Sequence, residues 1–218
     1  LVPNELAKGF AVFGEQKLGW LLKESFYLCS SDIDPAYAKR LHEAAFKFQR
    51  EDVAKALNIK RAMLAWEMGT GKTFGGIEFI RLSGSKHVLV VCPAMARAVW
   101  EADLEKWWPS HYQVAVICDG KEADNFALEY GHEPFICVTS YELLKKLRLP
   151  NSIDCVVADE SHYVKEPTVG RSKALRDILN KYAPEHRLFL TGTPITVKPI
   201  DIHNQVDMLY PGRFGNQR

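Results

Sequence analysis

The sequence predicts an α/β fold in which helices cover both faces of a mostly parallel central sheet. From about residue 44, short β-branched runs alternate with segments of helical pattern, which is typical of right-handed βαβ units. Runs such as Val88–Cys92 and Cys155–Ala158 are apolar throughout, as expected for strands that are buried on both faces. The chain has 218 residues, 47% of them hydrophobic, which is enough for one large domain with its own core.

The elements of this domain follow one another as strand and helix along the chain. The predicted strands are Arg61–Ala65, His87–Cys92, Gln113–Cys118, Phe135–Thr139, Ile153–Ala158 and Arg187–Thr191. The predicted helices are 72–82, 94–107, 121–130, 140–147, 170–181 and 199–210. Ligands of parallel sheets bind at the carboxyl ends of the strands, so residues that directly follow a strand are the candidates for a functional site.

Residues 1–43 have a different pattern and are predicted to form a small N-terminal β/α accessory element. Segments 9–13 and 19–29 are rich in aromatic and branched residues and predict short strands, with a hairpin as one arrangement. A helix is expected to follow over residues 36–45. Residues 44–218 then form the main domain.

Composition and charge narrow the class of protein. The 28 Lys and Arg residues nearly balance the 27 Asp and Glu residues, so the net charge of +1 indicates neither DNA nor a membrane surface. A domain that shares a nucleic-acid site with another domain need not be basic, however. No apolar run reaches 18 residues, so no membrane span is expected. The first residue, Leu1, and the tail Phe214–Arg218 indicate a chain cut from a longer protein.

The five cysteines, Cys29, Cys92, Cys118, Cys137 and Cys155, are widely spaced and form no CxxC pair. Most lie in apolar, strand-like runs, so buried free thiols in a reducing intracellular compartment (cytoplasm, nucleoid or nucleus) are expected rather than disulfides. The histidines show no HxxxH or HExxH spacing, and no structural metal is expected.

The segment Ala65–Thr73 predicts a phosphate-binding loop. It follows a predicted strand, and Gly69–Gly71 gives it a backbone that can turn tightly and point N–H groups inward. Lys72 supplies a charge for the β- and γ-phosphates, Thr73 a hydroxyl ligand for Mg²⁺, and the following helix its positive N-terminus. The strict GxxxxGK[ST] pattern fails at its first position, where Trp66 replaces glycine. An ordinary strand–turn–helix is the competing interpretation.

An acidic motif, Asp159-Glu160-Ser161-His162, follows another apolar predicted strand. Asp159 is predicted to hold Mg²⁺, partly through water, and Glu160 to orient and deprotonate an attacking water. Taken alone, the motif could be a solvated acidic turn, and His162 could be a packed surface residue rather than a coupling residue. Together with the phosphate loop, the motif predicts hydrolysis of a nucleoside triphosphate.

Several motifs in the same order resemble those of superfamily 2 helicases and, among these, Snf2-type double-stranded DNA translocases. The resemblance covers about residues 44–215 and includes Phe48-Gln49, Met68–Thr73, Asp159–His162 and Leu190–Pro194. The Snf2 form of the phosphate loop also lacks the first glycine. The DESH box and the compact spacing are most similar to the HARP-like annealing-helicase branch.

This resemblance implies a RecA-like P-loop NTPase domain, the first motor lobe of an ATP-dependent enzyme that translocates on or remodels duplex DNA. It implies ATP and Mg²⁺ as cofactors, duplex DNA as a partner, and a second RecA-like lobe in the full-length protein that is absent from this chain. An arginine finger from that second lobe is expected to be required. Without that arginine, the isolated lobe is expected to hydrolyse ATP slowly or not at all. The fragment is also expected to be monomeric.

The resemblance also implies roles for individual residues. The catalytic residues are Lys72, Asp159 and Glu160. Adenine is read by Gln49, and the nucleotide site comprises Gln49, Met68, Gly69, Thr70, Gly71, Lys72 and Thr73. Mg²⁺ is held by Thr73 and Asp159. Hydrolysis is coupled to the nucleic acid by His162, Thr191, Gly192 and Thr193. The DNA contacts are Pro93, Arg97, Thr139 and Ser140, although Arg97, Thr139 and Ser140 could each be ordinary surface.

Two other interpretations stay open at this point. The chain could belong to an RNA helicase or a restriction-system translocase of the same superfamily. It could also be a nucleotide-dependent module that clamps DNA or a partner without productive turnover. Trp100, Trp107 and Trp108, at helical spacing, are expected to pack in the core rather than to stack on bases.

Overall fold

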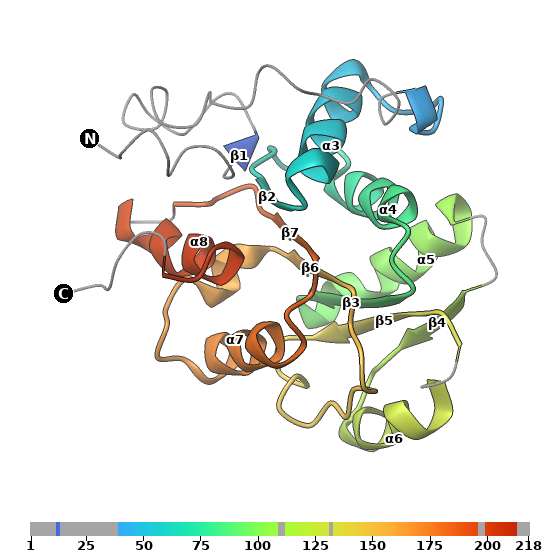
Figure 1. Cartoon of the computed structure of the whole chain (residues 1–218), viewed down its shortest axis with the longest axis vertical. Coiled ribbons are helices and arrows are strands. Elements are labelled where there is room, and N and C mark those ends of the chain that lie inside the picture. Colours follow the sequence, from blue (N-terminus) through green and yellow to red (C-terminus); the bar gives the residue numbers. More distant parts are fainter. Residues whose placement is uncertain (1–11, 14–38, 109–111, 131–132, 196–198, 213–218) are drawn as a thin grey trace.

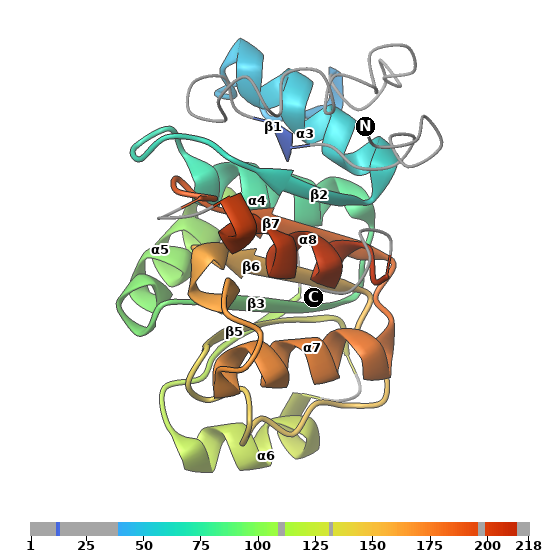
Figure 2. The same cartoon turned by 90° about the vertical axis from the view of Figure 1, so that its left-hand side faces the viewer.

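A computed structural model describes residues 12–13, 39–108, 112–130, 133–195 and 199–212. At its centre is a seven-stranded sheet in the order β1-β2-β7-β6-β3-β5-β4. All the strand pairs of this sheet are parallel. Figures 1 and 2 show helices on both sides of the sheet. The α/β architecture predicted from the sequence is therefore confirmed.

The strands lie close to their predicted positions. They are β1 (Val12–Phe13), β2 (Arg61–Leu64), β3 (His87–Cys92), β4 (Gln113–Val116), β5 (Phe135–Ser140), β6 (Cys155–Asp159) and β7 (His186–Leu190). From β2 onward, the observed and predicted ends differ by at most two residues. The fully apolar runs of β3 and β6 occupy central positions of the sheet, as expected for strands covered on both faces.

The α-helices are α3 (Lys47–Ile59), α4 (Lys72–Ser83), α5 (Arg97–Trp107), α6 (Gly120–Tyr130), α7 (Gly170–Tyr182) and α8 (His203–Leu209). Short 3₁₀ helices are η1 (Ala94–Ala96), η2 (Ser161–Val164) and η3 (Pro199–Ile202). The helix predicted over 140–147 is wrong, because this segment forms consecutive turns. Its buried apolar residues, Tyr141, Leu144 and Leu147, recur every third position, which suits successive turns of three residues better than an α-helix.

The N-terminal part of the main domain also differs from the prediction. Helical residues end at Arg40 rather than near residue 45, and α3, which was not predicted, begins at Lys47. The guanidinium of Arg50 donates hydrogen bonds to the carbonyl oxygens of Leu41, His42, Glu43 and Ala45. Because these carbonyls bond to a side chain, the backbone at 41–45 does not need helical hydrogen bonds.

The short strand β1 extends the main sheet at its edge. Val12 pairs with Met63 and Phe13 with Leu64, in parallel. The segment predicted as strand at 19–29 lies outside the described residues, as do the first three residues, 36–38, of the predicted helix 36–45. The boundary between an accessory element at 1–43 and the main domain stays a prediction.

The two faces of the sheet bury separate hydrophobic cores. Alternate residues of β3 supply them, with Leu89 and Val91 in one core and Val88, Val90 and Cys92 in the other. Helices α6, α7 and α8 cover the first core, and α3, α4 and α5 cover the second. The carboxyl ends of the central strands are thereby fixed relative to one another, and the candidate site lies at those ends.

Gly76 in α4 lies at a close approach of the helix to its neighbours. A Cβ atom there would lie 2.8 Å from Cη2 of the buried Trp100 and 3.2 Å from Cδ1 of Leu190. A Cβ at Gly170 in α7 would meet only the flexible end of Lys145. Since both changes remove a helical glycine, we expect Gly76→Ala to be less stable than Gly170→Ala by about 1–3 kcal/mol, the typical cost of overpacking. Urea unfolding of both variants measures this difference, and equal stabilities would contradict it.

Candidate nucleotide-binding site

The phosphate loop connects β2 to α4, as the sequence predicts. Gly69 and Gly71 adopt left-handed backbone conformations with φ of 78° and 79°, which L side chains rarely adopt. Gly71 is the N-cap of α4, which starts at Lys72. The first N–H groups of this helix have no partner within the helix and form an anion-binding end.

The Lys72 ammonium lies inside the loop. Its Nζ donates to the carbonyl oxygens of Glu67, at 3.1 Å, and Trp66, at 3.3 Å. A Cβ placed on Gly192, in the loop after β7, would lie 3.5 Å from Nζ. Lys72 also interacts electrostatically with both Asp159 and Glu160. The predicted phosphate-binding cation therefore lies beside both predicted catalytic carboxylates.

Gln49 ties the loop to the start of α3. The side chain is 3% exposed; its amide N–H donates to the carbonyl of Thr70 at 2.8 Å, and its oxygen accepts from the Phe46 N–H at 2.8 Å. A Cβ at Gly71 would lie 2.8 Å from the Gln49 amide nitrogen, so this contact leaves no room for a side chain at 71. Adenine recognition by Gln49 stays a prediction, while its contact with the loop is a feature of the structure.

Asp159 ends β6 with a buried carboxylate that is 7% exposed. Its Oδ2 accepts from Trp100 Nε1 at 2.9 Å and its Oδ1 from the Glu160 N–H at 2.9 Å. Burial raises the pKa of Asp159, and the Trp100 hydrogen bond opposes that rise. A carboxylate has about four lone-pair sites, so two donors leave it the capacity to bind a cation or its water.

Glu160 has a left-handed backbone, with φ 49° and ψ 52°, which is rare for a residue other than glycine. Backbone of this kind costs about 1–3 kcal/mol and is concentrated at functional sites. The carboxylate lies 3.2 Å from Nδ1 of His162. The His162 hydrogen bond is the main cause that lowers the pKa of Glu160, with further contributions from Lys72 and the Gly192 amide. Glu160 is therefore held ionised, as a base must be.

The predicted coupling residues lie together around His162. Its Nδ1 is 3.3 Å from Thr191 Oγ1 and 3.4 Å from Thr193 Oγ1. The Thr193 N–H donates to Thr191 Oγ1 at 3.1 Å, which shapes the turn after β7. Glu160, His162 and the loop after β7 thus form one contiguous polar group.

The residues predicted to contact DNA differ in exposure. Pro93 and Arg97 are half-buried at the start of α5, whereas Thr139 and Ser140 are buried at the end of β5. The Arg97 guanidinium donates to the carbonyl oxygens of Ala94, Ile117 and Cys118. A role for these four residues in DNA binding stays a prediction, which the burial of Thr139 and Ser140 does not favour.

Three residues behind the site make contacts that were not predicted from the sequence. Trp100, expected only to pack, hydrogen-bonds to Asp159, and Tyr141 donates its hydroxyl to the Asp159 carbonyl at 2.7 Å. Gln205 in α8 accepts from Ser161 Oγ at 2.7 Å and donates to the Pro194 carbonyl at 3.1 Å. Gln205 thereby joins the turn after β6 to the loop after β7. No local sequence signal identifies such contacts, because the partners are far apart in the chain.

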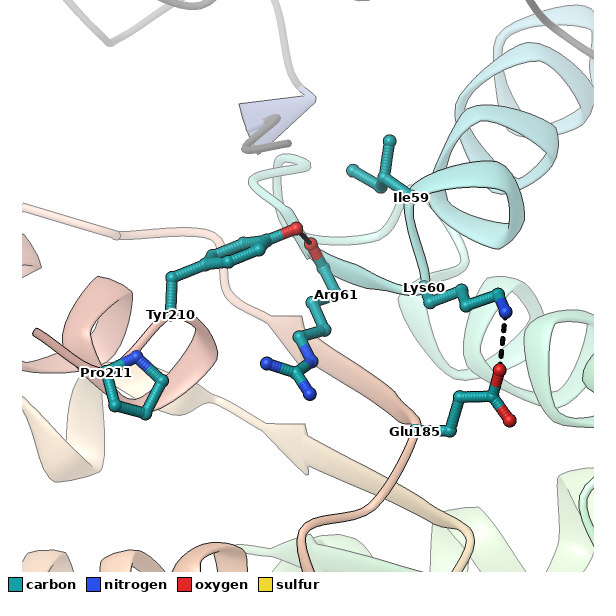
Figure 3. Close-up of a pocket in the computed structure, with 6 residues that line it drawn as sticks. All are labelled: Ile59, Lys60, Arg61, Glu185, Tyr210 and Pro211. Carbon is teal, nitrogen blue, oxygen red and sulfur yellow. Dashed lines mark hydrogen bonds and ion pairs between the residues drawn. The ribbon is translucent and has the colours of Figure 1, made fainter. Parts of the chain in front are cut away.

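A pocket of about 290 Å³ lies at the opposite, amino-terminal end of β2 and β7. Figure 3 shows its lining, in which Lys60 pairs with Glu185 and the Tyr210 hydroxyl donates to the Arg61 carbonyl at 2.7 Å. The phosphate loop leaves β2 at its other end. This pocket is therefore separate from the nucleotide site.

The described ranges also bear on thiols, metals and membranes. Cys92, Cys137 and Cys155 are buried free thiols, as predicted, whereas Cys118 is a free thiol that is exposed; Cys29 lies outside these ranges. No group of three or more His, Cys, Asp and Glu side chains in them could hold a metal ion. None of the helices found there has the length and apolar character needed to cross a membrane.

Comparisons with known proteins agree with this geometry. A family model described as the SNF2-related domain matches residues 18–218. The DNA annealing helicase and endonuclease ZRANB3 of Mus musculus is 30% identical over 186 residues, which cover 81% of this chain and 17% of that protein. The SWI/SNF-related matrix-associated actin-dependent regulator of chromatin subfamily A-like protein 1 of Xenopus tropicalis is 29% identical over 173 residues, which cover 77% of this chain and 17% of that protein.

A solved structure of similar fold is the Sulfolobus solfataricus SWI2/SNF2 ATPase core in complex with dsDNA. It matches with a TM-score of 0.63 and 25% identity, over 76% of this chain and 36% of that one. The RecA-like fold is thereby confirmed. The chain spans only 17% of the length of the two curated relatives.

Proposed function

The chain belongs to the SNF2-related domain family, and we propose that it is the ATP-binding motor lobe of a DNA-dependent ATPase that translocates on or remodels duplex DNA. The observation that carries the proposal is the meeting of Lys72, Asp159 and Glu160 at the carboxyl ends of β2 and β6. The names of the relatives, an annealing helicase and an ATPase core in complex with dsDNA, support DNA as the partner. A DNA-dependent ATPase of this kind would act inside the cell, where its DNA lies.

The residues at this edge fit ATP and Mg²⁺. The Lys72 ammonium is bonded to two backbone carbonyl oxygens, which the β- and γ-phosphates can replace as acceptors. Thr73 and Asp159 would hold Mg²⁺, Asp159 partly through water. When bound, Mg²⁺ neutralises charge on the phosphate oxygens. Gln49 would contact the adenine from the start of α3, and Met68, Gly69, Thr70 and Gly71 would surround the phosphates.

Glu160 acts as the general base in this proposal. Its carboxylate would orient a water molecule and take up the proton that the water loses. The pKa of Glu160 is lowered chiefly by the hydrogen bond from His162, so the group is an ionised carboxylate at neutral pH, which is the form that acts as a base. The positive charge of Lys72 attracts both carboxylates and favours their ionised forms.

The coupling path runs through His162. Because His162 contacts Glu160 as well as Thr191 and Thr193, a shift of the loop after β7 changes the surroundings of the base. Gly192 completes this loop beside Lys72. A second RecA-like lobe would close over this edge, and Pro93, Arg97, Thr139 and Ser140 would lie on the DNA side.

The proposal is tested by the ATP turnover of the longer protein that joins this chain to a second lobe, with duplex DNA, single-stranded DNA or RNA added. We expect duplex DNA to stimulate turnover and Lys72→Ala to lower it by about 10²-fold or more, as for other groups that stabilise transition-state charge. Stimulation by RNA alone would assign the chain to an RNA helicase. Turnover that none of the three stimulates would contradict the motor and favour a nucleotide-dependent clamp.

A further inference from the structure

Trp100 makes a polar contact that connects α5 to the end of β6. The side chain is 0% exposed, and its indole Nε1 donates to Asp159 Oδ2 at 2.9 Å. The two residues are distant in sequence and are both buried. A hydrogen bond to a charged group is stronger than one between neutral groups, and a buried site screens it little.

The position of the indole is fixed by its neighbours. The ring packs against Gly76 of α4, where an added Cβ would lie 2.8 Å from Trp100 Cη2. Because the ring is held in this position, its Nε1–H points toward the Asp159 carboxylate. With Oδ2 bound to Trp100 and Oδ1 bound to the Glu160 N–H, the Asp159 carboxylate has one defined orientation.

Trp108, which follows the same helix, shows what an indole that only packs looks like. Its Nε1 is buried and has no hydrogen-bond partner in the described part of the chain. Trp108 packs beside the core of α3, α4 and α5, and Tyr112 lies against it. The two tryptophans therefore differ in whether the N–H reaches a functional carboxylate.

From this geometry we infer that Trp100 is a positioning residue, which holds the Asp159 carboxylate in the orientation that binds Mg²⁺. The inference rests on the proposed function, in which Asp159 is a Mg²⁺ ligand. Hydrogen-bond partners of metal ligands orient those ligands, and their loss typically costs about 10–100-fold in metal affinity or activity.

The test compares Trp100→Phe with Trp108→Phe in this chain. Each removes one indole N–H and leaves an aromatic ring at the same position. Binding of a fluorescent ATP analogue is titrated with Mg²⁺ and is also measured in EDTA. We expect Trp100→Phe to raise the Mg²⁺ concentration at half-maximal binding by about 10–100-fold, with binding in EDTA unchanged. Trp108→Phe is expected to behave as the parent chain.

The other outcomes separate the inference from the proposed function. An unchanged Mg²⁺ requirement in Trp100→Phe would overturn the inference alone, as would an equal loss of binding with and without Mg²⁺, which would show a purely structural role. A parent chain that binds the analogue without any dependence on Mg²⁺ would overturn the proposed metal site and the inference with it.

A second measurement needs no change at Trp100, in case Trp100→Phe does not fold. The chain is labelled with ¹⁵N at its indoles, and the Trp100 signal is assigned by elimination from Phe variants of the other tryptophans. Adding Mg²⁺ to the chain saturated with nucleotide is expected to shift the Trp100 N–H signal and not the Trp108 signal. Equal responses of the two signals, or none at Trp100, would overturn the inference.

Discussion

Replacing Glu160 by Gln is expected to lower ATP turnover by about 10²–10⁴-fold, the range typical for loss of a general base. The amide has the shape of the carboxylate but cannot take up a proton from water. Nucleotide binding is expected to persist, because the phosphate loop and Lys72 are unchanged. Single-turnover hydrolysis and nucleotide affinity, measured in the protein that joins this chain to a second lobe, separate the two effects.

Glu129→Gln is the matched control for this change. Glu129 is exposed on α6, which covers the core away from the nucleotide site, so the same chemical change there should leave turnover at its parent value. The comparison also decides between a motor and a clamp. A motor with Glu160→Gln loses its action on DNA, whereas a clamp keeps it. Unaltered hydrolysis in Glu160→Gln would contradict the role of Glu160 as base.

The parts of the site that could be predicted from the sequence are those fixed by local chain geometry. A glycine-containing loop after a strand and two carboxylates at the end of another strand meet in any parallel sheet that brings these strands close. The structure places β7 between β2 and β6, so the loop at Lys72, the carboxylate of Asp159 and the turn at Thr191 all lie at one edge. The local sequence pattern is therefore sufficient to predict that these three segments belong to one site.

The parts that could not be predicted depend on contacts between distant residues. No pattern in the sequence indicates that Trp100 contacts Asp159. A tryptophan is expected to be buried whether or not its N–H makes such a hydrogen bond. Four of the five carbonyls at 41–45 accept hydrogen bonds from Arg50, so this segment, predicted as helix, is not helical. Thr139 is buried at the carboxyl end of β5, where it pairs with Val91 of β3, although a hydroxyl that faces a ligand was expected there.

Joining this chain to a second RecA-like lobe is expected to raise its turnover by about 10³–10⁵-fold, the range that an arginine finger supplies. The reason is that Lys72 is the positively charged side chain at the phosphate loop, while nearby arginines are bound to other groups. The Lys72 ammonium faces the phosphate loop, whereas the Arg97 guanidinium is bound by three backbone carbonyls. Arg171 donates to the Tyr163 carbonyl and Arg176 pairs with Asp207. These three guanidinium groups of the described residues are engaged elsewhere, and we expect the charge that develops on the γ-phosphate to be stabilised by a cation from the second lobe.

Single-turnover hydrolysis by this chain, alone and joined to the second lobe, measures the effect. Lys72→Ala in the two-lobed protein is the control, because it keeps the second lobe and removes the first cation. If the second lobe acts by supplying an arginine, replacing that arginine by alanine should return the rate to that of this chain alone, with nucleotide still bound. Robust DNA-stimulated turnover by residues 1–218 alone would contradict the argument. It would mean that Lys72, Asp159 and Glu160 suffice, and that closure of the lobes serves movement along DNA rather than the chemical step.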